Sequence, residues 1–215
     1  MKNIGIIILL ILCSCTLYQD DKEPEIFFQY SKFEILELGK SFSDMIISDN
    51  QNAIYLADYN NNSVLKINTQ NSLLIENNTI VGSHPIALDI SSDKSTIAIA
   101  HEGESSILLL NTQTMAVINS FSVSLMSMND LAFVNDTTLI ISSKTDPSCI
   151  TLNLVSREET TQSVLNGEFT LDKENEVLYV ATASSLKKYN WDGVRFYQDP
   201  HISDPYGFVG DIHHV

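Results

Sequence analysis

Acidic side chains recur at one position of a repeating pattern in this sequence. Asp44, Asp130 and Glu168 stand at the start of three apolar segments, and Ala87 takes the same position in another. Ca²⁺ takes about 6–8 oxygen ligands, so carboxylates gathered at the mouth of a channel would form a candidate calcium site. The alternative is that each carboxylate accepts hydrogen bonds from amides of neighbouring turns. Apart from this calcium site, we expect no cofactor.

A second polar set lies in predicted loops that share one end of the fold, because successive strands run in opposite directions. Its residue types suit contact with a protein, a glycan or a small molecule. The set consists of Asp58, Tyr59, Asn60, Asn61, His84, His101, Glu102, Lys144, Asp146 and Ser184. The alternative is a solvated loop face without a ligand, since loops between strands are polar in any case.

The remaining candidates for chemistry match no recognised motif. A C-terminal group has metal-ligand residue types without a recognised spacing: His201, Asp204, Asp211, His213 and His214. Cys149 lies in an apolar stretch, which predicts a buried small hydrophobe and not a nucleophile. The sequence has no nucleophile elbow, haem-attachment motif or Gly-rich phosphate loop, so we expect a protein that is not an enzyme.

A repeat of about 40 residues positions these side chains. The apolar segments centred on Ile54, Ile97, Leu139 and Leu178 are spaced by 43, 42 and 39 residues. An asparagine recurs nearly in step, at Asn68, Asn111, Asn153 and Asn190. Each period holds four short segments rich in β-branched residues, separated by turn residues, and no sustained helical period. We therefore expect an all-β chain in which each repeat forms one four-stranded antiparallel blade of a β-propeller.

Two stretches carry a family resemblance. Residues 54–69 and 84–93 resemble YVTN-type β-propeller repeats, and the resemblance extends from about residue 40 to 200. It implies an architecture far more than an activity. The domain is predicted to span 31–215, with repeats at about 43–82, 83–126, 127–166 and 167–205.

Two partial repeats flank the four complete ones. Residues 33–38 have the pattern of a lone outer strand, and residues 207–212 resemble the first strand of a new repeat. Propellers close their ring and so remove exposed sheet edges. Four complete repeats plus two partial ones therefore predict an incomplete ring, either from a truncated propeller or from one closed by a partner chain.

The N-terminus has the layout of an export signal. A basic start precedes an apolar run over residues 4–12, which is far shorter than the roughly 20 residues of a membrane-spanning helix. Leu12-Cys13-Ser14-Cys15 resembles the lipobox of bacterial lipoproteins. The resemblance implies a signal peptide over 1–14, lipidation of Cys15 and an acidic linker over 15–30; the alternative is an ordinary secretory signal.

Charge narrows the classes of partner. The chain carries 12 Lys plus Arg against 27 Asp plus Glu, a net charge of -15, which argues against binding nucleic acid. We expect a lipid-anchored binding module of the bacterial cell envelope, at the outer membrane, on its periplasmic or surface face. The membrane and an unidentified protein, glycan or small-molecule ligand would be its partners.

Two alternatives remain from the sequence. One is a propeller enzyme of the lactonase or quinoprotein-like type, with Asp44, Asp130 and Glu168 as metal ligands in its channel. The other is a fragment of a larger propeller.

Overall fold

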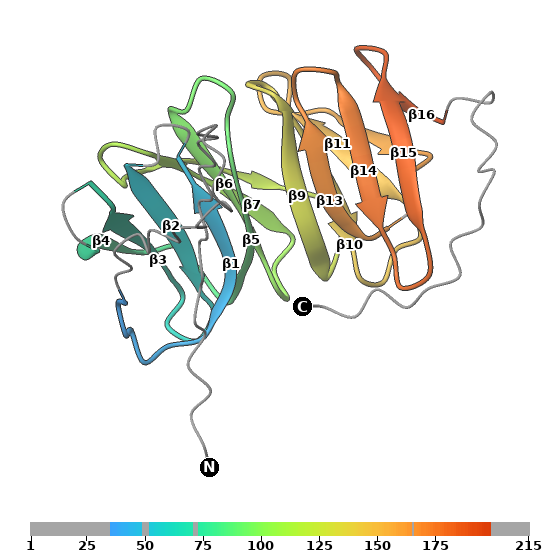
Figure 1. Cartoon of the computed structure of the whole chain (residues 1–215). Helices are drawn as coiled ribbons and strands as arrows, with labels where there is room; N and C mark the ends of the chain where they lie inside the picture. The colour runs from blue at the N-terminus through green and yellow to red at the C-terminus, as the bar shows by residue number, and fades with distance from the viewer. Residues whose placement is uncertain (1–34, 49–51, 71–72, 165, 199–215) are drawn as a thin grey trace, which may run out of the picture.

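A computed structural model describes residues 35–48, 52–70, 73–164 and 166–198, and every regular element among them is a β-strand. Four antiparallel four-stranded sheets follow one another along the chain, and we call them blades 1 to 4 (Figure 1). Blade 1 contains β1 (Phe42–Ile47), β2 (Ala53–Asp58), β3 (Ser63–Asn68) and β4 (Leu74–Ile80). Blade 2 contains β5 (Pro85–Ile90), β6 (Thr96–His101), β7 (Ser106–Asn111) and β8 (Val117–Ser122).

The last two blades repeat this order. Blade 3 contains β9 (Met128–Asn135), β10 (Thr138–Ser143), β11 (Cys149–Asn153) and β12 (Glu159–Gln162). Blade 4 contains β13 (Glu168–Asp172), β14 (Val177–Ala181), β15 (Leu186–Trp191) and β16 (Phe196–Tyr197). In every blade the strands pair in chain order, so the predicted all-β architecture of four complete repeats is confirmed.

The recurring asparagine has a local structural task. The Asn111 side-chain oxygen accepts hydrogen bonds from the amides of Gln113 and Thr114, at 3.0 and 2.8 Å. Asn153 does the same for Val155 and Ser156, both at 2.9 Å. Asparagine favours such turns because its short side chain can bond the backbone two residues on. In blades 2 and 3 the repeated asparagine therefore stabilises the turn that leads to the outermost strand, whereas in blade 4 Asp192 accepts the equivalent bonds from the amides of Val194 and Arg195.

Apolar side chains hold neighbouring blades together. We call the side of a blade that points toward the next blade its forward face, and the opposite side its backward face. Between blades 2 and 3, small forward residues such as Ala87, Ala98 and Ala100 lie in one buried cluster with the backward residues Leu131 and Phe133. Small side chains on one sheet leave room for large ones on the next, which allows the dense packing of a protein interior.

The four blades form an arc and not a closed ring. Their innermost strands β1, β5, β9 and β13 are neighbours in that order, and blades 1 and 4 lie at opposite ends of the described fold in Figure 1. The predicted incomplete ring is thus what the structure has.

One predicted strand is different in the structure. Residues 35–38 form no strand, although Leu36 and Leu38 pack against the backward face of blade 1 beside Leu65. These contacts bury apolar side chains. None of the described strands pairs with residues 35–38, so the backbone hydrogen bonds of a strand are not formed. The predictions on residues 1–34, including Cys15, and on residues 207–212 lie outside the described residues. The described part of the chain also contains no helix of the length and apolarity that crossing a bilayer requires.

Candidate functional site

Four of the residues predicted for the loop face form a cluster that crosses three blades. The Tyr59 hydroxyl donates a hydrogen bond to the Glu102 carboxylate, and the Tyr59 ring lies against the His84 ring with centroids 4.6 Å apart. Lys144 Nζ lies 3.2 Å from Glu102 Oε1. Tyr59 follows β2, His84 and Glu102 flank strands of blade 2, and Lys144 follows β10. We call Tyr59, His84, Glu102 and Lys144 the loop-face cluster.

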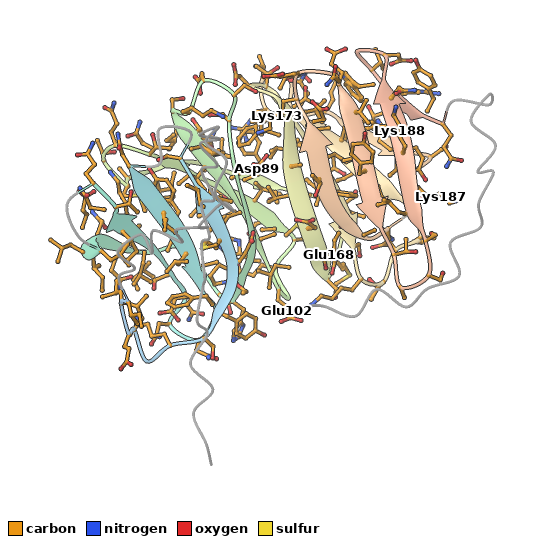
Figure 2. All side chains as sticks on the ribbon, in the orientation of Figure 1. Asp89, Glu102, Glu168, Lys173, Lys187 and Lys188 are labelled. Carbon is orange, nitrogen blue, oxygen red and sulfur yellow. The ribbon has the colours of Figure 1, made fainter. Side chains whose placement is uncertain are left out.

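Contacts within the loop-face cluster shift the pKa values of its members. Glu102 lies at the lower end of the blades in Figure 2. The hydrogen bond from Tyr59 and then the Lys144 ammonium lower the pKa of Glu102, and the same bond raises the pKa of Tyr59. Half of the Lys144 side chain and over a third of Glu102 remain exposed, at 47% and 37%. The cluster therefore presents an aromatic pair beside an accessible ion pair, a combination suited to contact with polar or charged ligands.

Two other residues of the predicted face are buried and hold the fold together. Asp58 is fully buried and accepts hydrogen bonds from Lys40 Nζ at 2.7 Å and from the Asn61 side chain. Burial alone would raise the pKa of Asp58, but the bonds from Lys40 and Asn61 outweigh it and lower the pKa. His101 is 1% exposed, with Nε2 3.0 Å from the Val81 carbonyl oxygen. Both side chains are buried, so in this structure neither belongs to the accessible part of the predicted loop face.

The rest of the predicted set stays apart from the cluster. Asp146 accepts a hydrogen bond from Ser143 Oγ at 3.1 Å within its own loop. Asn60 is exposed in the β2–β3 turn, and Ser184 is exposed in the β14–β15 loop of blade 4.

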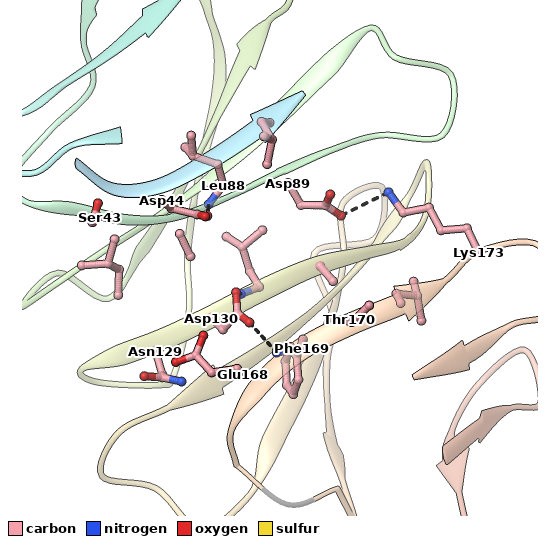
Figure 3. A pocket seen from close by; sticks show the side chains of 16 residues that line it. Ser43, Asp44, Leu88, Asp89, Asn129, Asp130, Glu168, Phe169, Thr170 and Lys173 are labelled. Carbon is pink, nitrogen blue, oxygen red and sulfur yellow. Dashed lines mark hydrogen bonds and ion pairs between the residues drawn. The ribbon is translucent and has the colours of Figure 1, made fainter. Parts of the chain in front are cut away.

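The acidic residues of the innermost strands line a second feature, an open pocket of about 340 Å³ between the four blades (Figure 3). Its walls include Asp44, Asp89, Asp130, Glu168 and Lys173. The pocket therefore lies where the sequence analysis predicted the mouth of a central channel, although the pocket is open because the four blades form an arc.

Most of these carboxylates bond to the main chain of the next blade. Asp44 Oδ2 accepts a hydrogen bond from the Leu88 amide at 2.6 Å, and Asp130 Oδ2 accepts one from the Phe169 amide at 2.6 Å. Blade 2 has Ala87 at this position, and Asp89, two residues on, accepts from the Phe133 amide at 2.7 Å instead. We call these three contacts the interblade carboxylate bonds; two of them are drawn in Figure 3.

The hydrogen bonds of Asp44 and Asp130 agree with the predicted alternative of amide acceptors. Asp44 and Asp130 are amide acceptors, although their donors lie in the next strand and not in a turn. No three His, Cys, Asp or Glu side chains of the described residues come close enough to hold a metal ion. Asp44, Asp130 and Glu168 form no such group in this part of the chain, and the first two bond to main-chain amides of the following blade.

Burial changes the acidity of these groups. Burial raises the pKa of Asp130 to about 7, against the lowering effect of the amides of Phe169 and Leu131. The pKa of Asp44 is also raised, mainly by burial, with smaller contributions from Glu168 and Asp89. Burial likewise raises the pKa of Cys149 to about 12, and the prediction that this residue is buried is confirmed.

Sequence reasoning missed Lys173 and Asp89. Lys173 follows β13 in blade 4, and its ammonium reaches blade 2, 3.2 Å from Asp89 Oδ2 and 2.7 Å from the Ile90 carbonyl oxygen. The two residues are separated by 84 positions, so no local pattern points to their contact. The sequence offered one signal for Asp89: Ala87 stands where the other repeats have a carboxylate, so a nearby acidic residue could have been expected to replace it.

Comparisons with known proteins support the fold alone. A scan against protein-family models finds no match, and a search of curated proteins finds none either. Among solved structures, the chain is similar to Kuenenia stuttgartiensis hydrazine synthase, with a TM-score of 0.62 and 11% identity over 80% of this chain and 51% of that one. It is also similar to the WD40 repeats of RRP9, with a TM-score of 0.59 and 16% identity over 76% and 52% of the two chains.

A third similar structure is the C-terminal WD40 domain of Sif2, with a TM-score of 0.57 and 15% identity over 77% of this chain and 47% of that one. The chain therefore spans about half the length of the structures it matches. Together with the four antiparallel sheets, these similarities show a β-propeller-type fold.

Proposed function

We propose that this protein is a membrane-anchored extracytoplasmic lipoprotein whose β-propeller binds a protein, glycan or small-molecule ligand through the loop-face cluster. The observation that carries the binding proposal is the contact of Tyr59, Glu102 and Lys144 across three separate blades. Loops held by a rigid scaffold are where binding residues concentrate. The resemblance of Leu12-Cys13-Ser14-Cys15 to a lipobox supports the anchored, envelope-located part of the proposal.

Ligand binding can be tested with the purified propeller on a glycan array and in a thermal-shift panel of small metabolites. We expect a ligand whose affinity falls about tenfold or more in Tyr59→Ala and Lys144→Ala, because a tenfold loss corresponds to about 1.4 kcal/mol, within the range of one charged contact. Gln113→Ala is the matched control, since Gln113 is exposed in the β7–β8 turn at the other end of the blades. Ligands that bind all three variants equally would place the site elsewhere.

Anchoring is tested separately by labelling cells that express the full chain with an alkyne-bearing fatty acid. Label on the wild-type protein and its loss in Cys15→Ala, but not in Cys13→Ala, is the expected result. Equal labelling of the wild type and Cys15→Ala would contradict lipidation at Cys15.

A further inference from the structure

The forward face of blade 4 is exposed, although it has the pattern of a face that packs. Phe169, Leu178 and Val180 lie in the buried cluster between blades 3 and 4. Because side chains alternate across a strand, the residues between them point the other way. Leu186 on this forward face is 60% exposed, and no described blade covers it.

Blade 1 shows what such a face does when it is covered. The paired strands align Ile46, Tyr55 and Lys66 in blade 1, and Thr170, Tyr179 and Lys188 in blade 4. The neighbouring row is Asp44, Ala57 and Val64 in blade 1, and Glu168, Ala181 and Leu186 in blade 4. In blade 1 the apolar members of these rows are buried against the backward face of blade 2, with Tyr55 3% exposed and Val64 fully buried. Blade 4 thus repeats, nearly residue for residue, a surface that elsewhere in this chain is an interface.

Glu168 lacks the contact that its counterparts make. Asp44 and Asp130, at the same register position, each accept a main-chain hydrogen bond from the following blade. Within the described part of the chain no hydrogen bond or ion pair joins the Glu168 carboxylate to another residue, and Figure 3 shows this carboxylate in the pocket beside those of the other strands. A following blade would supply the missing amide.

We propose that the forward face of blade 4 is a docking surface for a further blade whose innermost strand is residues 207–212 of this chain. The surface continues a series of three interfaces of the same design. Residues 207–212 align with Pro85–Ile90 of β5, so Ile212 takes the place of Ile90, which is buried against the forward face of blade 1. Gly210 then takes the place of Leu88, the residue whose amide bonds Asp44.

Spacing and chain length agree with this register. Gly210 follows Glu168 by 42 residues, while the equivalent donors follow Asp44 by 44 and Asp130 by 39. The connection from Tyr197, the last residue of β16, to residue 207 is longer than the connections between the described blades, so the segment can reach the face. Glu168 accepting the Gly210 amide would be the next interblade carboxylate bond.

Hydrogen–deuterium exchange of the full chain tests the proposal. We expect the amides of residues 207–212 to exchange at least about fivefold more slowly than in an unstructured peptide of the same sequence, because docking lowers their access to solvent. Leu186→Asp places a charge on the face and should restore the unstructured rate. Glu168→Ala should restore the unstructured exchange rate at the Gly210 amide. Glu174→Ala is the matched control, because it removes an exposed carboxylate from the β13–β14 turn, and it should leave the protection unchanged.

Exchange at the unstructured rate in the wild type would overturn the proposal, as would protection that survives Leu186→Asp. If Leu186→Asp removes the protection but Glu168→Ala leaves Gly210 protected, the docking surface is supported and the Glu168–Gly210 contact is contradicted. Exchange of the β5–β7 peptides reports whether each variant is still folded.

Discussion

At the scale of single residues, burial decides what the acidic side chains do. Asp130 is removed from water and placed near Asp44 and Glu168, so its charged form is disfavoured in spite of the two amides that it accepts. Tyr59 and Glu102, by contrast, lie near the surface and stabilise one another's protonation state. Carboxylates therefore join neighbouring blades in the pocket, whereas on the loop face the Glu102 carboxylate remains partly accessible to solvent.

Asp130→Asn should change how stability depends on pH. The folded-state pKa of about 7 lies above the ordinary aspartate value of 3.8, so between these values the folded state binds more protons than the unfolded state. Stability contributed by Asp130 is then present at low pH and lost as pH rises toward 7. An asparagine side chain cannot ionise yet keeps an acceptor for the Phe169 amide, so the variant should gain stability relative to the wild type as pH rises from about 5 to about 8.

Urea unfolding at several pH values, followed by the fluorescence of the buried Trp191, measures this difference. A difference between variant and wild type that does not change over this pH range would contradict the raised pKa of Asp130.

At the scale of elements, the blades are joined by two kinds of contact. Apolar faces supply most of the burial, but they do not by themselves fix how far one sheet slides over the next. The interblade carboxylate bonds supply a directional contact from the innermost strand of one blade to that of the next. Lys173 adds a longer link from blade 4 to Asp89 of blade 2.

Asp44→Ala should destabilise the fold by about 1–3 kcal/mol, because it leaves the amide of Leu88 without its acceptor at a buried interface. Asp44→Asn is the matched variant, since it removes the charge and retains an acceptor oxygen, and it should cost less. Chemical denaturation at neutral pH compares the two. Equal losses in both variants would mean that the charge of Asp44, and not its hydrogen bond to blade 2, matters for stability.

At the scale of the whole molecule, an open arc and a large negative charge act together. The net charge of -15 is spread over a chain in which only a few ion pairs join described residues, so unscreened carboxylates repel one another. Raising NaCl from about 20 mM to about 0.5 M shortens the screening length severalfold. We expect Tm to rise by a few degrees.

Thermal melts followed by circular dichroism check this expectation, with KCl as the control for ion-specific effects. A Tm that falls in both salts would show that ion pairs such as Lys40–Asp58 outweigh the repulsion.

Local chemistry is what the sequence by itself determined about this protein. Turn residues and β-branched segments act over a few residues each, and their pattern recurs about every 40 residues. The number and order of the strands could therefore be predicted from the sequence. The position of the loop-face residues at one end of the blades follows from strand direction alone. Residues 35–38 of the predicted strand are not a strand in the structure, because a strand needs a paired neighbour that the sequence does not show.

The tertiary structure alone decided which of these residues meet. Asp58 and His101 are as polar as Tyr59 and Glu102, yet packing buries the first two and leaves the others accessible. The carboxylates of the innermost strands could not be assigned from their spacing, because a metal ion and a neighbouring amide call for the same residue type. Only the stacking of one blade on the next, which brings together residues about 40 positions apart, places an amide where each carboxylate can accept it.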